Sequence, residues 1–271
     1  ACEPEWAELT KILGGKHVKV YSATHARQDP HRIQARPSLI ARLRNADLAV
    51  CTGAELEAAW MPMLQRRARN PKVMPGKPGY FEATDQVRLL EKPRRLDRTG
   101  GDVHAEGNPH IHLDPRRIRR VAAVLAKRLQ TIDPKHSNSY QRRWKTFDNR
   151  WRDSMARWNQ QAKPLQGKKA VVYHREWIYL LDWLSIKRIG SLEPNPGVPP
   201  TLSHISKLSS LEKPDMIIIT PLNDKKPATW LQDKSGGRLV TLPHTVGAVG
   251  AAKDYFKLFD TIISRLLKPE T

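Results

Sequence analysis

The spacing of hydrophobic residues in the first part of the chain predicts alternating strands and helices. Residues 18–22 (VKVYS) and 48–52 (LAVCT) are short apolar runs of strand length. Between them, residues 37–46 are predicted to form a helix, because its first residue is a proline, which is favoured in a first turn. Residues 54–69 repeat apolar side chains at a spacing of four, which predicts a second helix that Pro62 should kink or split. This order of elements is typical of α/β proteins.

The middle of the chain has a different pattern. Between residues 139 and 162 the apolar side chains recur at spacings of three and four, at Tyr140, Trp144, Phe147, Trp151, Met155, Trp158 and Ala162. This pattern predicts one long amphipathic helix, and its roughly 24 residues would span about 36 Å. A coiled-coil helix for a partner protein is the alternative. A stripe that carries three tryptophans is more typical of packed core, so we interpret this helix as a strut between two α/β segments.

After Gly167 the strand pattern returns. Apolar runs predict strands at residues 170–173, 186–192, 216–220 and 239–242. The last periodic segment, residues 255–267, predicts a helix with apolar side chains along one face. The second half of the chain is therefore also predicted to be α/β.

The charge of the chain first suggests a polyanion partner. Its 47 Lys and Arg residues against 27 Asp and Glu give a formal net charge of +20, and such an excess favours binding to phosphates. Much of the excess nevertheless falls on the polar faces of predicted helices, at Arg116, Arg117, Arg119, Arg120, Lys127 and Arg128. No zinc-knuckle, glycine-rich RNA-binding or Walker pattern accompanies these residues. We interpret them as solvated basic faces and expect no nucleic-acid partner.

The cysteines and the first residues bear on the compartment. The sequence has neither the run of about 20 apolar residues that a membrane helix needs nor a basic-then-apolar leader. The start ACEPEWAELT is compatible with a mature form whose signal peptide has been removed. Cys2 and Cys51 are either two buried thiols or a disulfide of an oxidising compartment. The Ala1-Cys2 start also leaves a lipid anchor on Cys2 open.

Four histidines fall where an α/β protein binds ligands. His110 lies in GNPHIHLDPR, where Pro109 and Pro115 stiffen the backbone before a helix that Asp114 should cap. His31 follows the first predicted strand, and two further histidines end strands of the second half, at His174 and His244. Ligands bind at the carboxyl ends of parallel strands, and four imidazoles would close a Zn²⁺ shell, which argues for binding rather than catalysis. We leave His17, His25, His136 and His204 as ordinary histidines.

These residues resemble a known family, the periplasmic zinc/manganese-type solute-binding proteins of ABC importers (cluster A-I). The segment DPH at residues 29–31 followed by RPS at 36–38 is similar to the DPH…PS element of that family. The segment NPHIHLDP at 108–115 resembles its DPHxWLDP element, and VVYH at 171–174 resembles the strand that delivers a third ligand. The stretches ADL at 46–48 and GAELE at 53–57 also match.

The resemblance implies a fold and a ligand set. The expected architecture is α/β, with two Rossmann-like lobes, each a mostly parallel four-stranded sheet with flanking helices, joined by one long rigid helix. We expect lobes at residues 1–136 and 166–271 with the connecting helix at 137–165. The implied metal ligands are His31, His110 and His174.

The chain departs from the family pattern at several positions. The fourth ligand is often an aspartate, whereas LPHT at residues 242–245 puts His244 there, with Asp224 as the alternative. His112 replaces the usual tryptophan and is expected to be exposed. Asn108 replaces an aspartate that shapes the turn. A histidine-rich loop is reduced to His104.

The predicted function is therefore an extracytoplasmic, periplasmic receptor that captures a divalent transition metal and delivers it to a membrane ABC permease. An all-imidazole site favours Zn²⁺ over Mn²⁺, which prefers oxygen donors, and Glu176 or Glu106 is expected to orient the imidazoles. We expect a monomer without enzymatic activity. The alternative is a zinc-dependent hydrolase that uses the same histidine cluster, with His244 or Glu176 as the base, although no HExxH motif or nucleophile elbow is present.

Overall fold

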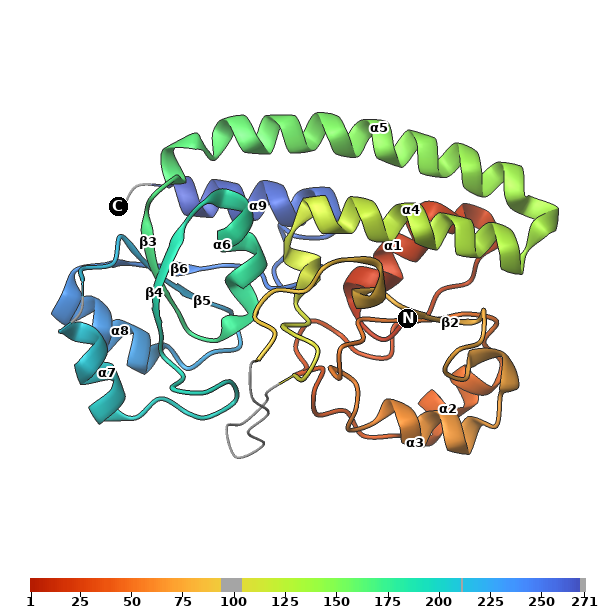
Figure 1. The fold of residues 1–271 in the computed structure, drawn as a ribbon, viewed down its shortest axis with the longest axis horizontal. Coiled ribbons are helices and arrows are strands. Elements are labelled where there is room, and N and C mark those ends of the chain that lie inside the picture. Colours follow the sequence, from red (N-terminus) through yellow and green to blue (C-terminus); the bar gives the residue numbers. More distant parts are fainter. Residues whose placement is uncertain (94–103, 211, 269–271) are drawn as a thin grey trace.

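The computed structural model describes residues 1–93, 104–210 and 212–268. Two α/β lobes lie next to each other, and one long helix crosses both of them (Figure 1). The α/β class with a two-lobe architecture is confirmed. The division of the chain at residues 136 and 165 stays a prediction.

The C-terminal lobe is built on a four-stranded sheet in the order β4-β3-β5-β6, in which every pair is parallel. The strands are β3 (Lys169–Val172), β4 (Lys187–Ser191), β5 (Met216–Ile219) and β6 (Arg238–Thr241). All four lie within one or two residues of their predicted ranges. The lobe also contains the helices α6 (Ile178–Leu184), α7 (Leu202–Ser209), α8 (Lys225–Ser235) and α9 (Tyr255–Leu267). Because the strands are parallel, His174 and His244 both follow the carboxyl ends of their strands, at the same end of the sheet.

The N-terminal lobe has a smaller sheet than expected. Its described residues form the helices α1 (Pro4–Gly14), α2 (Pro37–Arg44) and α3 (Met61–Ala68), and one parallel pair of strands, β1 (Ala49–Cys51) and β2 (Tyr80–Glu82). The expectation of four strands in this lobe is wrong for the part of the chain that the structure describes. The predicted strand at residues 18–22 belongs to no sheet, and α1 and β2 were not predicted.

Backbone pairing at the edge of β1 explains the missing strand. The amide of Cys2 donates to the carbonyl of Val50 (2.8 Å), and the amide of Thr24 donates to the carbonyl of Cys2 (3.0 Å). Residues 1–2 therefore lie between β1 and the segment that follows residue 22. Residues 18–21 and the β1 residues Ala49 and Val50 line one cavity of about 820 Å³. The amino group of Ala1 also donates to the carbonyl of Tyr21 (2.8 Å), so residues 1–2 occupy the position beside β1 that a strand at residues 18–22 would need.

The helix predicted over residues 54–69 begins only at Met61. Pro62 lacks a backbone N–H, so it fits the first turn of a helix and disfavours the interior. The preceding residues form turns, in which Ala54 and Glu55 adopt left-handed backbone angles (φ 48° and 66°). The proline therefore starts the helix rather than kinking it.

The long helix is α5 (Ser137–Gln161), which confirms the strut predicted over residues 139–162. It follows α4 (Pro115–Ile132), lies along it, and continues over the other lobe to α9 (Figure 1). Short 3₁₀ turns connect the elements: Gly15–His17, Pro71–Val73, Thr84–Gln86, Ile111–Leu113, Pro134–His136, Lys163–Leu165 and Arg175–Trp177. No described helix has the length and apolar continuity needed to cross a membrane.

Trp151 connects this helix to both of its neighbours. The ring is fully buried, and its Nε1 donates to the carbonyl of Pro115 at the start of α4 (2.8 Å). Its centroid lies 5.0 Å from that of Phe256 and 5.7 Å from that of Phe259, both on α9. One side chain of the strut therefore contacts the helix behind His110 and the last helix of the C-terminal lobe.

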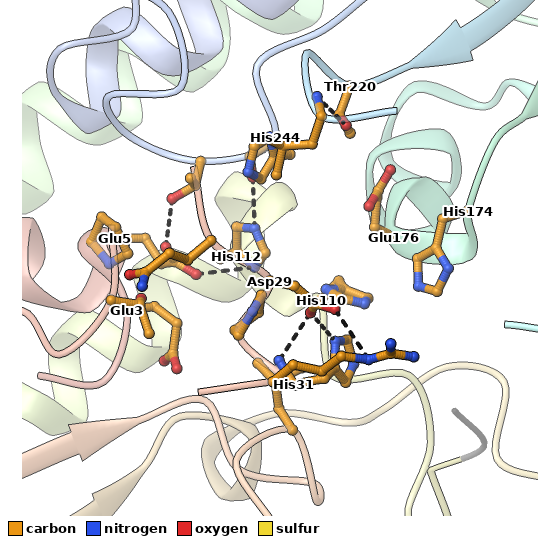
Figure 2. Close-up of a pocket in the computed structure, with 18 of the residues that line it drawn as sticks. Glu3, Glu5, Asp29, His31, His110, His112, His174, Glu176, Thr220 and His244 are labelled. Atoms are coloured by element: carbon orange, nitrogen blue, oxygen red, sulfur yellow. Dashed lines mark hydrogen bonds and ion pairs between the residues drawn. The ribbon is translucent and has the colours of Figure 1, made fainter. Parts of the chain in front are cut away.

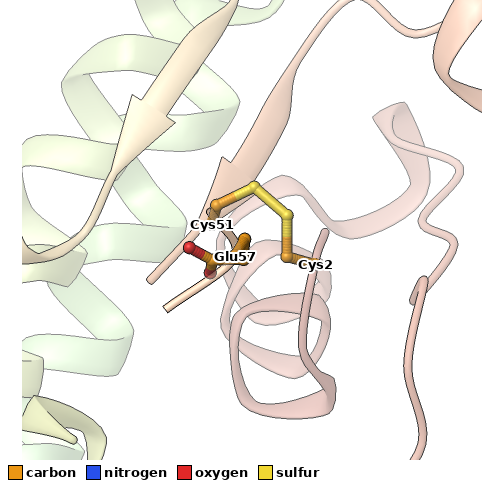
Figure 3. A group of neighbouring side chains, drawn as sticks. All are labelled: Cys2, Cys51 and Glu57. Carbon is orange, nitrogen blue, oxygen red and sulfur yellow. A yellow bond between two sulfur atoms is a disulfide. The ribbon is translucent and has the colours of Figure 1, made fainter. Parts of the chain in front are cut away.

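Cys2 and Cys51 form a disulfide, so the alternative of two free thiols is wrong (Figure 3). Glu57 lies beside it, and its carboxylate accepts hydrogen bonds from the amides of Thr52 (2.7 Å) and Gly53 (3.1 Å). Among the described residues, Cys2, Cys51 and Glu57 are the only group of three His, Cys, Asp or Glu ligand atoms within 4.8 Å of one another. Disulfide sulfurs are not thiolates, so we do not regard this group as a metal site.

Trp151→Ala should destabilise the protein strongly. Removing a fully buried tryptophan leaves a cavity and should lower the free energy of unfolding by about 3–5 kcal/mol, and here it also orphans the Pro115 carbonyl. Urea unfolding of the metal-free protein measures the loss. Trp230→Ala on α8, where the ring is partly exposed, is the matched control and should cost less; equal losses would contradict a special role for Trp151.

Glu3→Gln should stabilise the protein more at about pH 8 than at about pH 5. Burial, together with the charges of Glu57 and Glu5, raises the pKa of Glu3 well above 4.5, so the folded state retains a proton that the unfolded state releases. Stability is then lost as the pH rises above 4.5, by about 1.4 kcal/mol for each unit by which the pKa is raised. A glutamine carries no such charge. Urea midpoints at both pH values test this, with the exposed Glu106→Gln as control; identical pH dependence in all three proteins would refute it.

Candidate metal centre

The four predicted histidines line one cavity of about 340 Å³ between the lobes (Figure 2). His31 belongs to the N-terminal lobe, His110 precedes α4, and His174 and His244 follow strands β3 and β6 of the C-terminal lobe. His112 and Glu176 also line this cavity. The structure thus brings these residues from both halves of the chain into one cavity, and their role as metal ligands stays a prediction.

His31 is held by the aspartate two residues before it. Asp29 Oδ1 accepts a hydrogen bond from the amide of His31 (3.0 Å) and lies 2.8 Å from its Nδ1. Desolvation opposes ionisation of Asp29, but its hydrogen bonds and charge interaction with His31 keep its pKa below the usual value on balance. Because a carboxylate only accepts, Nδ1 carries the proton and Nε2 the lone pair. Nε2 is the nitrogen suited to a metal.

His110 lies on a rigid and largely buried turn. Its amide donates to Asn108 Oδ1 (3.0 Å), and the Asn108 carbonyl accepts from the hydroxyl of Tyr179 (2.6 Å). Asp114 is fully buried and accepts from the amide of Arg116 (2.8 Å), so it caps α4 as predicted. Burial lowers the pKa of His110 well below 6.5, with further lowering from the neighbouring histidines. The ring is therefore neutral, which is the form that binds metals.

His174 has its own carboxylate partner. Its Nδ1 lies 2.7 Å from Glu193 Oε2, and the same oxygen accepts from the amide of Gly197 (2.9 Å). This again leaves the lone pair on Nε2. The predicted orienting groups were Glu176 and Glu106, and for His31 and His174 the structure supplies Asp29 and Glu193 instead. Glu106 is exposed and does not line the cavity.

Ring contacts join three of the four predicted residues. The His110 centroid lies 6.0 Å from that of His31 and 5.5 Å from that of His174. His104, which the sequence analysis did not assign, joins this set: its Nε2 lies 3.4 Å from His31 Nε2. No three of these histidines place their nitrogens within 4.8 Å of one another in the described residues. An ion bound by all of them would therefore require small ring or lobe movements.

His244 lies in a second part of the cavity, beside His112. The carbonyl oxygen of His244 is 2.9 Å from His112 Nε2. Burial lowers the pKa of the His244 ring to about 4. The alternative residue, Asp224, is exposed, accepts from the amide of Lys226 (3.0 Å) as the N-cap of α8, and does not line the cavity.

His112 is buried, so the expectation that it is exposed is wrong. The 3₁₀ turn Ile111–Leu113 carries its ring toward the contact between the lobes, where Nδ1 lies 3.6 Å from Glu5 Oε1. Glu5 comes from α1, a helix that the sequence analysis did not recognise. Glu176 lines the cavity as well, and burial raises its pKa to about 7.

Known proteins resemble this chain in sequence and in fold. A family model described as "ZnuA: Zinc-uptake complex component A periplasmic" matches residues 1–268. The high-affinity zinc uptake system protein ZnuA of Yersinia pestis is 24% identical over 191 residues, which are 66% of this chain and 60% of that protein. The manganese ABC transporter substrate-binding lipoprotein PsaA of Streptococcus pneumoniae is 22% identical, over 84% of this chain and 74% of that protein.

Solved structures share the fold. A crystal structure of ZnuA superposes with a TM-score of 0.76 at 20% identity and covers 98% of both chains. The Mn-bound periplasmic metal binding protein from Candidatus Liberibacter asiaticus gives a TM-score of 0.79 at 16% identity, over 98% of this chain and 96% of that chain. Because the family model spans nearly the whole sequence, the chain belongs to the ZnuA family of metal ABC transporter substrate-binding proteins.

Proposed function

We propose that this protein captures Zn²⁺ in the cleft between its lobes and delivers it to an ABC permease. The observation that carries the proposal is the ring cluster of His31, His110 and His174, which come from separate segments of the chain and meet in one cavity. Two of the rings are oriented by carboxylates, as metal-bound histidines usually are. His244 stays a predicted fourth ligand, and His104 is a second candidate for that position because of its contact with His31.

The choice of zinc rests on the donor atoms. Relatives are named for different metals: zinc in Yersinia pestis, manganese in Streptococcus pneumoniae, and iron for the lipoprotein MtsA of Streptococcus pyogenes. Imidazole nitrogens suit Zn²⁺, whereas Mn²⁺ prefers carboxylate and water oxygens. A site with three or four imidazoles is therefore expected to rank Zn²⁺ above Mn²⁺.

The disulfide and the ion pairs of α4 support a location and a set of partners for the protein. The Cys2–Cys51 disulfide supports an oxidising, periplasmic compartment. The basic residues of α4 are partly paired, for example Arg116 with Asp114 and Arg119 with Asp148, which supports a solvated helix face rather than a nucleic-acid surface. We propose a monomer whose partners are the ion and the permease.

A zinc hydrolase is the second candidate. One observation favours it: Glu176 lines the same cavity and its pKa of about 7 suits a general base. The named relatives are binding proteins and not enzymes, so binding remains the proposed function. Hydrolysis of activated esters by the zinc-loaded protein, abolished by Glu176→Gln, would favour the enzyme.

His174→Ala should weaken the tightest zinc binding by more than the roughly 10–100-fold that loss of an outer partner costs. Glu193→Gln should fall within that range, because it removes only the group that orients the ring. Elemental analysis of the purified protein followed by competitive titration against a chelator measures both. His136→Ala, which lies outside the cavity, is the control and should bind as the wild type does. Unchanged affinity in His174→Ala would remove the proposed site.

Zinc should change the overall shape only slightly. The strut α5 is one continuous helix of 25 residues packed against both lobes, and such a helix makes a poor hinge. Small-angle scattering of the chelator-stripped and zinc-loaded protein should give closely similar radii of gyration. A large decrease on loading would show that the lobes close as separate bodies.

A further inference from the structure

His110 and His112 are separated by one residue, yet they face different groups. The ring of His110 contacts those of His31 and His174. The ring of His112 lies between Glu5 of α1 and His244 of the C-terminal lobe, as Figure 2 shows. The two ring centroids are 6.1 Å apart. The short 3₁₀ turn thus presents one imidazole to each of two neighbouring polar clusters.

The environment of His112 defines which nitrogen can bind a cation. Its Nε2 lies 2.9 Å from the carbonyl oxygen of His244, which can only accept, so Nε2 carries a proton. Its Nδ1 is buried and has no hydrogen-bond partner. The 3.6 Å from Nδ1 to Glu5 Oε1 is too long for a hydrogen bond. Two ligand atoms on one tetrahedral Zn²⁺ lie about 3.4 Å apart, so this separation suits a shared ion.

The other side chains of the cluster supply further ligand atoms. In the described residues, Glu5, His112 and His244 do not place three of these atoms within 4.8 Å of one another, so an ion held by all three would require movement of the rings. The hydroxyl of Thr245 donates to Glu5 Oε2 (2.5 Å), which leaves Oε1 toward His112. His244 Nδ1 is a second buried imidazole nitrogen without a hydrogen-bond partner. Glu5, His112, His244 and Thr245 all line the interlobe cavity. The donors come from α1, from the turn before α4, and from the loop after β6.

Charge also favours a cation here. Glu5 is buried, and no Lys or Arg in the described chain forms an ion pair with it. A buried carboxylate without a close positive partner is costly. The protein as a whole is strongly basic, yet this cluster combines the Glu5 carboxylate with two buried imidazole nitrogens that have no hydrogen-bond partner.

We infer that Glu5, His112 and His244 form a second subsite for a divalent transition metal, adjacent to the His31–His110–His174 site. Two imidazoles and one carboxylate are a donor set that Zn²⁺ takes in proteins. This inference rests on the proposed function only in sharing its cavity and class of ion. It moves His244 out of the predicted four-histidine shell and leaves the fourth position of that shell to His104.

Cobalt titration tests the subsite, because Co²⁺ replaces Zn²⁺ in nitrogen and oxygen sites and its visible absorption reports the ligand geometry. Untagged, chelator-stripped protein is titrated with Co²⁺ at neutral pH, with bound metal counted by equilibrium dialysis. The wild type should show two binding events. His112→Phe and Glu5→Gln should each lose one event, while His174→Ala loses the other and keeps the event that depends on His112. His136→Ala should keep both.

Each remaining outcome decides the matter. A wild type with one event that only His174→Ala removes keeps the receptor and refutes the second subsite. If His174→Ala changes nothing while His112→Phe removes an event, the subsite stands and the proposed function fails. If His244→Ala loses the same binding event that His174→Ala loses, His244 is a ligand of the His31–His110–His174 site. That result would overturn its assignment to the second subsite. Thermal unfolding of each metal-free variant shows whether it is folded. If His112→Phe is unfolded, Glu5→Gln, which preserves the shape of the side chain, tests the second subsite in its place.

Discussion

The packing of the strut α5 against α4 and α9 is the constraint on which the rest of the structure depends. The aromatic rings of Phe147, Trp151 and Trp158 on the strut contact Phe256 and Phe259 on α9. These aromatic contacts are buried, and Trp151 also donates a hydrogen bond to Pro115 at the start of α4. They therefore fix the position of α9 relative to α4, the helix that follows His110. Helices of both lobes pack against α5, and this packing sets the position of the cleft between the lobes. Its histidines can then be neighbours although they are far apart in the sequence.

The cleft uses carboxylates mainly to orient imidazoles. Asp29 and Glu193 each hold one ring through Nδ1, which leaves Nε2 to face the cavity. Burial keeps the rings of His110 and His244 neutral by lowering their pKa values. Neutral imidazoles with fixed tautomers are ready to bind a transition metal without first losing a proton. The geometry therefore fits a site for a transition-metal ion.

The two histidines of the segment NPHIHLDP link the rings of His31 and His174 to a second polar cluster of the cavity, the floor of the cleft, which consists of Glu5, His112, His244 and Thr245. A single 3₁₀ turn places His110 against the rings of His31 and His174, and His112 against the buried carboxylate of Glu5. The polar contacts of Thr245 with Glu5 and of His112 with the His244 carbonyl also connect the C-terminal lobe to α1 and to the turn before α4. The floor of the cleft is thus a contact between the lobes that contains two buried imidazole nitrogens without a hydrogen-bond partner.

The spacing of hydrophobic residues along the sequence determined much of the fold of this protein. The strut, the four strands of the C-terminal lobe and the last helix follow from spacing alone, because a buried face must recur with the period of its element. The motifs around His31, His110 and His174 also indicated which histidines meet. The N-terminal lobe was less predictable, since the edge of β1 is taken by Cys2, a pairing between residues distant in sequence. The burial of His112 and the contacts of Glu5, Glu193 and His104 could not be predicted either, because they also depend on residues distant in sequence. Which groups face an imidazole is decided by how the lobes pack, and only the tertiary structure contains that information.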